Sequence, residues 1–154
     1  MVKKIVDISD GKSIQDYYDS RLMNCGNGYQ GKYPKVLAVC SAGLLRSATI
    51  AFILTRRPYN CNTRNCGSEP SYALVAIDVV LLEWADFVVY VNRDNQEMVE
   101  GEYGKCWLDG RLIKSYCFDL PDSFGYRDVK LVKIIKDKII SSGLKADLDT
   151  FNIK

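Results

Sequence analysis

One stretch of the sequence combines a nucleophile, a flexible turn and a fixed positive charge within eight residues. It reads Cys40-Ser41-Ala42-Gly43-Leu44-Leu45-Arg46-Ser47, that is, Cys, five residues, Arg and Ser. A cysteine thiolate can attack phosphorus, and an arginine presents two parallel N–H donors that match two oxygens of a phosphate. These residue types at this spacing indicate chemistry on a tetrahedral oxyanion.

The position of the stretch supports this interpretation. It joins an apolar run typical of a buried strand to a helical pattern, and a loop that turns from strand to helix points its backbone N–H groups inward. Gly43 can bend where a side chain would be strained. We therefore expect the loop to bind the oxyanion through the residues around its turn: Ser41, Ala42, Gly43, Leu44, Leu45 and Ser47.

Cys40 is the expected nucleophile of this loop. The inward N–H groups, the helix dipole and the Arg46 guanidinium all favour its thiolate over its thiol. Ser47 could donate a hydrogen bond to the sulfur and help it leave later. The alternative is structural: Cys40 ends a core strand, and Arg46 begins a helix as a solvated charge.

Composition narrows the classes of function. The chain has 154 residues, 47% of them hydrophobic, which suits one globular domain. Twenty-one basic against 19 acidic residues leave +2, too near neutral for an electrostatic nucleic-acid binder. There is no histidine, which excludes Ser-His-Asp and Cys-His hydrolases and His-ligated zinc catalysis. We expect neither cofactor nor metal.

The cysteines and the apolar stretches predict a cytoplasmic protein that does not enter a membrane. The N-terminal apolar run is too short for an export signal, so the six cysteines are not expected to form disulfides. Cys61 and Cys66 lack the second ligand pair of a zinc site. Residues 36–54 and 72–91 carry internal charges that exclude a membrane span.

Strand and helix patterns alternate along most of the chain. Strands are predicted over 35–40, 59–66, 86–92 and 112–118, and helices over 45–55, 71–84, 94–99 and 128–140. The alternation predicts an α/β fold, a small four-stranded parallel sheet with helices on both faces, in which ligands bind beyond the carboxyl ends of the strands. A segment rich in Gly and Pro separates this domain, residues 34–154, from an N-terminal appendage, residues 1–33, with a short helix over 13–23.

The Cys-x5-Arg-Ser loop after the first core strand resembles that of the low-molecular-weight protein tyrosine phosphatases. That family carries its general acid far downstream, often as Asp-x-Pro-Asp-Pro-aromatic-Gly, and this chain reads Asp119-Leu120-Pro121-Asp122-Ser123-Phe124-Gly125. The resemblance covers about residues 35–140 and implies the same flavodoxin-like fold. Aligned on the Pro and on Phe-Gly, it implies Asp122 as the acid, with Asp119 as the second choice. Phe124 and Tyr126 lie close enough in sequence to flank a planar substrate ring, and the alternative is that they are packing aromatics of the core or loop.

Two departures from the family's pattern lie inside the loop. Gly43 stands where the family usually has Asn, which leaves open how the loop is braced. Leu45 stands where the family has a second Cys, which removes the usual partner for a protective disulfide.

The resemblance implies a metal-independent phosphomonoester hydrolase of the protein tyrosine phosphatase type. Cys40 would form a phosphocysteine, Arg46 would hold the phosphoryl oxygens and Asp122 would protonate the leaving group. Its partner would be a phosphorylated protein or a small aryl phosphate, and phosphate-like oxyanions would inhibit it. Two alternatives remain: a non-catalytic phosphate-binding module, and an arsenate reductase whose relay thiols would come from Cys61, Cys66, Cys106 and Cys117.

Overall fold

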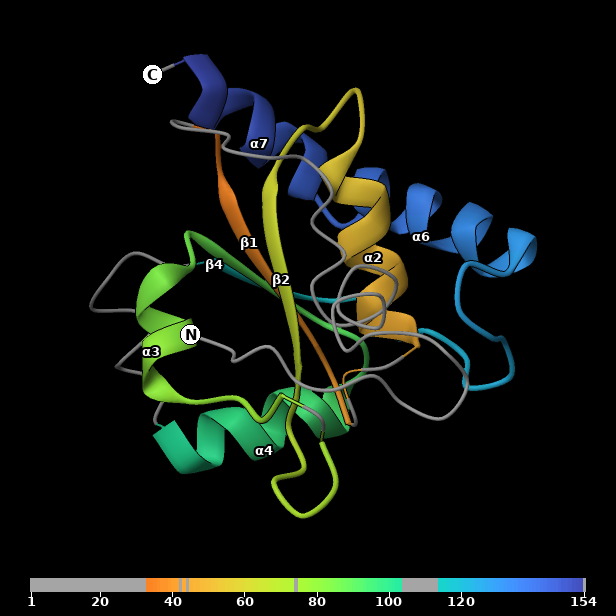
Figure 1. The fold of residues 1–154 in the computed structure, drawn as a ribbon. Coiled ribbons are helices and arrows are strands. Elements are labelled where there is room, and N and C mark those ends of the chain that lie inside the picture. The colour runs from red at the N-terminus through yellow and green to blue at the C-terminus, as the bar shows by residue number, and fades with distance from the viewer. Residues whose placement is uncertain (1–32, 42, 44, 74, 104–113, 154) are drawn as a thin grey trace, which may run out of the picture.

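Four parallel strands form the centre of the computed structural model, which describes residues 33–41, 43, 45–73, 75–103 and 114–153 (Figure 1). The strands are β1 (Lys35–Cys40), β2 (Asn62–Gly67), β3 (Phe87–Tyr90) and β4 (Lys114–Cys117). Their order is β2-β1-β3-β4, and every pairing is parallel. The predicted α/β fold is confirmed.

The strand order reverses at β1, where the candidate loop begins. The chain passes from β1 to β2 on one side of it and then crosses to β3 on the other. Connections leave neighbouring strands in opposite directions at such a point, and a crevice opens at the carboxyl edge of the sheet. The register pairs Cys40 with Gly67 and Val39 with Tyr90, so all three strands end at the same edge.

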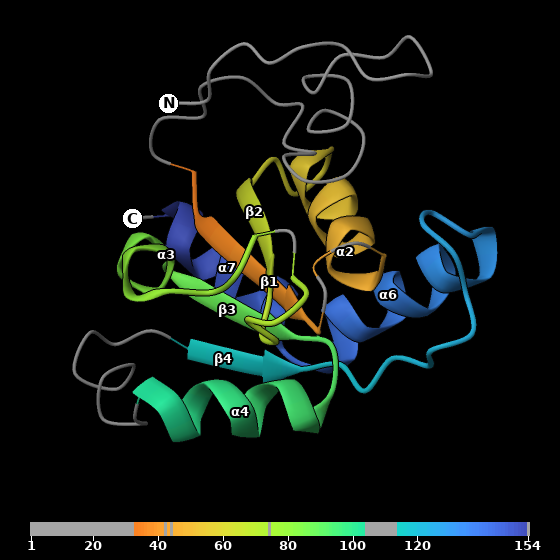
Figure 2. The ribbon, with the colours of Figure 1, turned by 60° about the horizontal axis from the view of Figure 1, so that its bottom comes forward.

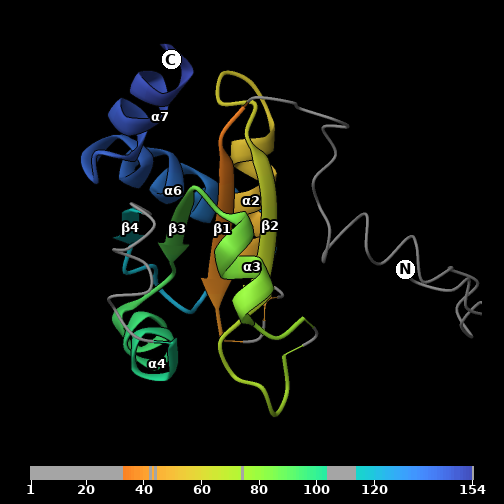
Figure 3. The same cartoon turned by 90° about the vertical axis from the view of Figure 1, so that its left-hand side faces the viewer.

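Helices cover both faces of the sheet (Figure 3). α2 (Arg46–Thr55), α6 (Val129–Ser141) and α7 (Leu144–Ile153) cover one face, where alternate β1 residues, Cys40 included, join a buried apolar cluster. α3 (Val79–Trp84) and α4 (Arg93–Tyr103) cover the other, where Val39 and Cys66 join a second cluster. Because successive strand side chains alternate between two covered faces, β1 is apolar from Val36 to Cys40.

Side-chain caps begin three of these helices. Asp78 accepts the Leu81 N–H at 2.9 Å at the start of α3, and Asp128 accepts the Lys130 N–H at 2.8 Å at the start of α6. Asn92 accepts the Asn95 N–H at 3.1 Å, so α4 begins at Arg93, one residue before the start of the helix predicted over 94–99. Each cap satisfies a backbone donor that has no partner inside the helix.

The other differences from the predicted elements have local causes. The helix predicted over 71–84 begins only at Val79, because Val75 and Ile77 pair with Gly67 and extend the sheet edge. The strand predicted from residue 59 begins at Asn62, after a turn in which Asn60 has a φ of 51°. α7 was not predicted, because only a narrow apolar stripe, Leu144, Leu148 and Phe151, reaches the core.

Several predictions concern residues outside those the structure describes. They are the appendage over 1–33, of which only the last residue is described, its helix over 13–23, and the first two residues of the strand predicted over 112–118. Among the described residues, no helix has both the length and the apolar character that crossing a membrane requires.

Candidate active site

The Cys40 sulfur lies at the carboxyl end of β1 and faces the start of α2. It accepts the Gly43 N–H at 3.1 Å and lies 3.0 Å from the Ser47 hydroxyl oxygen. The residue is only 4% exposed. Gly43 belongs to the loop, and Ser47 to the first turn of the helix that follows it.

Gly43 is required where the loop passes the neighbouring strand. Its φ is +76°, a conformation that side chains rarely adopt, and a Cβ there would lie 2.9 Å from the Cys66 carbonyl carbon and 3.0 Å from the Gly67 nitrogen. The backbone of β2 cannot give way to that contact. Glycine therefore lets the loop lie directly against β2 while its N–H reaches the Cys40 sulfur.

Two buried asparagines brace the loop from outside it. Asn65, on β2, donates to the Gly43 carbonyl at 2.9 Å. Asn95, on α4, donates to the Ser41 hydroxyl at 3.1 Å and to the Ser68 hydroxyl at 3.0 Å. Sequence reasoning missed both residues. No sequence signal marked them, because β2 reads Asn62-Thr63-Arg64-Asn65 and Asn95 lies in a polar helix, so neither amide stands out from its neighbours.

Arg46 joins the loop to a segment more than 70 residues away. Its Nη1 donates to the Leu120 carbonyl at 3.2 Å, and its Nη2 lies 3.5 Å from Asp122 Oδ1. The Arg46 side chain is 11% exposed and that of Asp122 87%. The guanidinium is thus held at the sheet edge, while the carboxylate stands at the surface above it.

The two aspartates weighed from the sequence occupy different surroundings. Asp122 forms an ion pair with Arg46, whereas Asp119 accepts a hydrogen bond from the Cys117 thiol at 3.4 Å and lies beside β4. Asp119 has a φ of 52°, a conformation that aspartate tolerates better than most residues. Of the two carboxylates, Asp122 is the one that contacts the loop.

The remaining predicted site residues belong to the loop, to the first turn of α2 or to the segment that follows Asp122. Ser41 is half-buried, Leu45 is exposed and Ser47 is fully buried. Phe124 packs half-buried against the cluster under α2, and the Tyr126 ring lies near the Arg127 guanidinium. Ala42 and Leu44 lie outside the described residues.

The other described thiols differ from Cys40 in their surroundings. Burial raises the pKa of Cys61 to about 12, and raises that of Cys66 well above its usual value, helped by the nearby Cys40 and Asp78 charges. Burial also raises the pKa of Cys117. These shifts keep the three sulfurs in the thiol form, which is a poor nucleophile. Cys25 and Cys106 lie outside the described residues.

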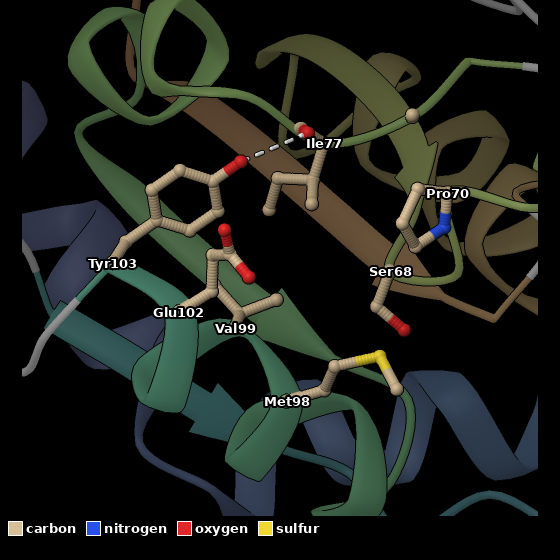
Figure 4. Close-up of a pocket in the computed structure, with 9 residues that line it drawn as sticks. Ser68, Pro70, Ile77, Met98, Val99, Glu102 and Tyr103 are labelled. Carbon is tan, nitrogen blue, oxygen red and sulfur yellow. Dashed lines mark hydrogen bonds between the residues drawn. The ribbon is translucent and has the colours of Figure 1, made fainter.

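A cavity of about 370 Å³ lies between the segment after β2 and α4 (Figure 4). Ser68, Met98 and Glu102 line it, and the Tyr103 hydroxyl closes one side by donating to the Ile77 carbonyl at 3.3 Å. Neither Cys40 nor Arg46 lines it, because it lies over the face of the sheet that α3 and α4 cover. The cavity is therefore separate from the thiol and its arginine.

Comparison with solved structures gives one informative similarity. SP-PTP, a low molecular weight protein tyrosine phosphatase from Streptococcus pyogenes, matches with a TM-score of 0.53. The chain has the fold of that phosphatase. The match covers 70% of this chain and 92% of SP-PTP, at 14% sequence identity, and confirms the resemblance in fold that the loop predicted. No family model matches the sequence, and no curated protein matches it significantly.

Proposed function

We propose that this protein is a metal-independent phosphomonoesterase that acts through a phosphocysteine on Cys40. The observation that carries the proposal is one constellation at the carboxyl end of β1: a sulfur with two hydrogen-bonding neighbours, and a guanidinium that contacts a surface carboxylate. The fold shared with a tyrosine phosphatase supports it.

The first step transfers the phosphoryl group to the enzyme. The Cys40 thiolate attacks phosphorus in line, an S–P bond forms, and the bond from phosphorus to the leaving oxygen breaks. Asp122 gives its proton to that oxygen, and the alcohol or phenol departs. The Arg46 guanidinium and the loop N–H groups hold the other three oxygens and stabilise their charge, so no step requires a metal.

The second step releases phosphate. Asp122, now a carboxylate, takes a proton from a water molecule whose oxygen attacks phosphorus, and the S–P bond breaks. The electron pair returns to the sulfur, where the Gly43 N–H and the Ser47 hydroxyl are placed to donate to it. Asp122 ends protonated, and the cycle can restart.

A phosphotyrosine-containing protein, or a small aryl phosphate, is the substrate that this site favours. A phenol is a better leaving group than an alkyl alcohol, and the aromatic side chains of Phe124 and Tyr126 follow Asp122 on the same segment. Inorganic phosphate and similar oxyanions would compete for the same N–H groups and for Arg46, so we expect them to inhibit.

Hydrolysis of para-nitrophenyl phosphate near pH 6 in the presence of EDTA tests the proposal. We expect the wild-type protein to release para-nitrophenol and to show a transient mass increase of one phosphoryl group on the Cys40 peptide. Cys40→Ser should lower kcat by about a thousandfold or more, because the attacking thiolate is gone. Undiminished hydrolysis by Cys40→Ser contradicts the mechanism.

The role of Asp122 is tested separately, with Asp119 as its matched control. Asp122→Asn should slow hydrolysis by about a hundredfold, and most for alkyl phosphates, whose leaving oxygens need the proton. Asp119→Asn should stay within about twofold of wild type. The reverse pattern would assign the acid to Asp119.

A further inference from the structure

Two arginine side chains enclose one aromatic ring beside the candidate site. The Arg56 guanidinium carbon lies 3.9 Å from the centre of the Phe52 ring, and that of Arg127 lies 4.1 Å from it. Two guanidinium groups so close to one ring centre cannot share a face, so they stack on opposite faces. Arg127 also lies 5.2 Å from the centre of the Tyr126 ring.

This arginine pair is connected to the candidate site through α2 and the segment before α6. Arg46 begins α2 and contacts Asp122; one turn later, Thr49 accepts the Arg127 N–H at 3.0 Å. Residues 122–127 therefore follow α2 from Arg46 towards Phe52, and Figures 1 and 2 show this segment leaving the sheet edge near the start of α2. Phe52 lies six residues after Arg46, which is about 9 Å along a helix axis.

The pair carries uncompensated positive charge. Both side chains are exposed, and among the described residues neither has an ion-pair partner, whereas Arg46 has Asp122. Arg57, also exposed, adds a third charge next to Arg56. Asp128, the acid nearest to Arg127 in sequence, instead caps α6.

Stacking prepares these guanidinium groups to bind an anion. A guanidinium held against a ring loses less side-chain freedom on binding, and its N–H donors still point outward around its edge. Two such groups on opposite faces of one ring present two separate sets of donors, which two acidic side chains can approach from solvent.

We propose that Arg56 and Arg127 form a second recognition surface that binds acidic side chains of the substrate, about three residues from the phosphotyrosine. The spacing follows from the 9 Å along α2, because an extended peptide covers about 3.3 Å per residue. The proposal rests on the proposed function, since it supposes that the phosphoryl group binds at Cys40 and Arg46. It selects acidic phosphopeptides over neutral ones.

Binding of fluorescent phosphotyrosine peptides to the Cys40→Ser protein tests the surface without requiring turnover. The peptides carry Glu, Gln or Lys at the positions three residues before and three after the phosphotyrosine. We expect the Glu peptide to bind about fivefold tighter than the Gln peptide in 20 mM salt, and the difference to shrink in 300 mM salt as the charges are screened.

Charge changes at the two arginines give the sharper result. Arg56→Gln or Arg127→Gln should bring the Glu-to-Gln ratio close to one, and Arg127→Glu should reverse the preference towards the Lys peptide. Arg64 supplies the control: its guanidinium stacks on Trp84 at 4.9 Å, away from the site, so Arg64→Gln should keep the wild-type ratio.

The outcomes separate this proposal from the proposed function. If the Gln peptide binds and competes with inorganic phosphate but the Glu peptide binds no better, the second surface is wrong and the phosphate site stands. An unchanged ratio in Arg56→Gln and Arg127→Gln also overturns it. If no phosphopeptide binds, and para-nitrophenyl phosphate is not hydrolysed by the wild-type protein, both proposals fail.

Discussion

Cys40 and Cys66 lie on adjacent strands near the same edge of the sheet, yet their sulfurs face opposite sides. Both are buried, with exposed fractions of 4% and 0%. The Cys40 sulfur accepts the Gly43 N–H and contacts the Ser47 hydroxyl. Among the described residues the Cys66 sulfur has no hydrogen-bond partner, and burial raises the pKa of its thiol.

The comparison teaches that depth alone does not determine what a thiol in this sheet can do. Cys66 faces the apolar cluster under α3 and α4, while Cys40 faces a loop and a helix start that supply donors. A one-residue change of register would exchange the two faces, since side chains alternate along a strand. What distinguishes Cys40 is therefore the connection that follows β1.

The largest effect that we expect is a difference in alkylation between the two sulfurs. In the folded protein, iodoacetamide should modify Cys40 at least about a thousandfold faster than Cys66, because only the thiolate reacts and Cys66 must await unfolding. Peptide-resolved mass spectrometry over a time course measures both rates. Inorganic phosphate should slow the modification of Cys40 alone.

Denaturant supplies the control for this difference. In 8 M urea the two cysteines should react at similar rates, because both are then ordinary solvated thiols. Equal alkylation rates in the folded protein would mean that the loop does not raise the reactivity of the Cys40 thiol, and would contradict the difference drawn between the two cysteines.

Gly43 links the two cysteines, so its substitution disturbs both sides of the comparison. Gly43→Ala should lower the free energy of unfolding by about 2–4 kcal/mol, since the left-handed φ is strained and the new Cβ meets the backbone of Cys66. It should also lower kcat at least about tenfold, because the N–H that reaches Cys40 must move. Urea unfolding and para-nitrophenyl phosphate kinetics measure the two effects.

Gly143 is the matched control for this substitution. It also has a positive φ, +93°, but nothing lies within 4 Å of a Cβ built there. Gly143→Ala should therefore cost only the conformational strain, about 1 kcal/mol, and leave kcat unchanged. Similar losses for both glycines would show that the contact with β2 is unimportant.

The loop was predictable from sequence because its chemistry is local. Cys40, Arg46 and Ser47 lie within eight residues, and an apolar strand before them places them at the edge of a parallel sheet. The preference for Asp122 came from a resemblance, and its contact with Arg46 came from the structure. The bracing was not predictable, because Asn65 is 22 residues from Gly43 and only the strand pairing brings them together.

The fold was predictable to the level of strand count, alternation and faces, and less so at the ends of elements. β1 and β3 were placed well, since long apolar runs have few alternatives. The helix predicted over 71–84 failed in its first half because Val75 and Ile77 are equally suited to an extended edge. Whether this segment is helical or extended depends on its pairing with Gly67 at the end of β2, and a local sequence pattern does not include that partner.

The buried thiols predict how stability depends on pH. The pKa of Cys61 is raised from 9.0 to about 12, and that of Cys66 is also raised, so above pH 9 the unfolded chain releases protons that the folded protein keeps. The stability contributed by the Cys61 thiol is thus complete below pH 9 and is lost as the pH rises towards 12, and that contributed by the Cys66 thiol is likewise lost above pH 9. A thiol that is ionised in the unfolded chain but still protonated in the folded protein lowers the free energy of unfolding by about 1.4 kcal/mol for each pH unit.

The variant Cys66→Ala separates the pH-dependent contribution of this thiol to stability from the pH-independent packing energy that is lost with its side chain. Free energies of unfolding in urea at pH 7, 9, 10 and 11 should fall less steeply for the variant than for wild type above pH 9. Below pH 8 the two curves should run parallel, separated by a constant packing difference. Equal slopes across the whole range would place the Cys66 thiol in ordinary solvent contact.

The smallest effect concerns Asn65, which connects β2 to the loop without touching the sulfur. Asn65→Ala removes the donor to the buried Gly43 carbonyl and should cost about 1–3 kcal/mol of stability, together with a roughly fivefold loss in kcat at little change in KM. Asn62 is its control on the same strand, since it donates to the Tyr33 carbonyl at 3.1 Å at the opposite end of β2. Asn62→Ala should leave kcat unchanged. If both variants lose activity in proportion to stability, Asn65 acts only as a structural residue. If only Asn65→Ala loses kcat, measured in protein that is fully folded at the assay temperature, Asn65 is a positioning residue that holds Gly43 towards Cys40.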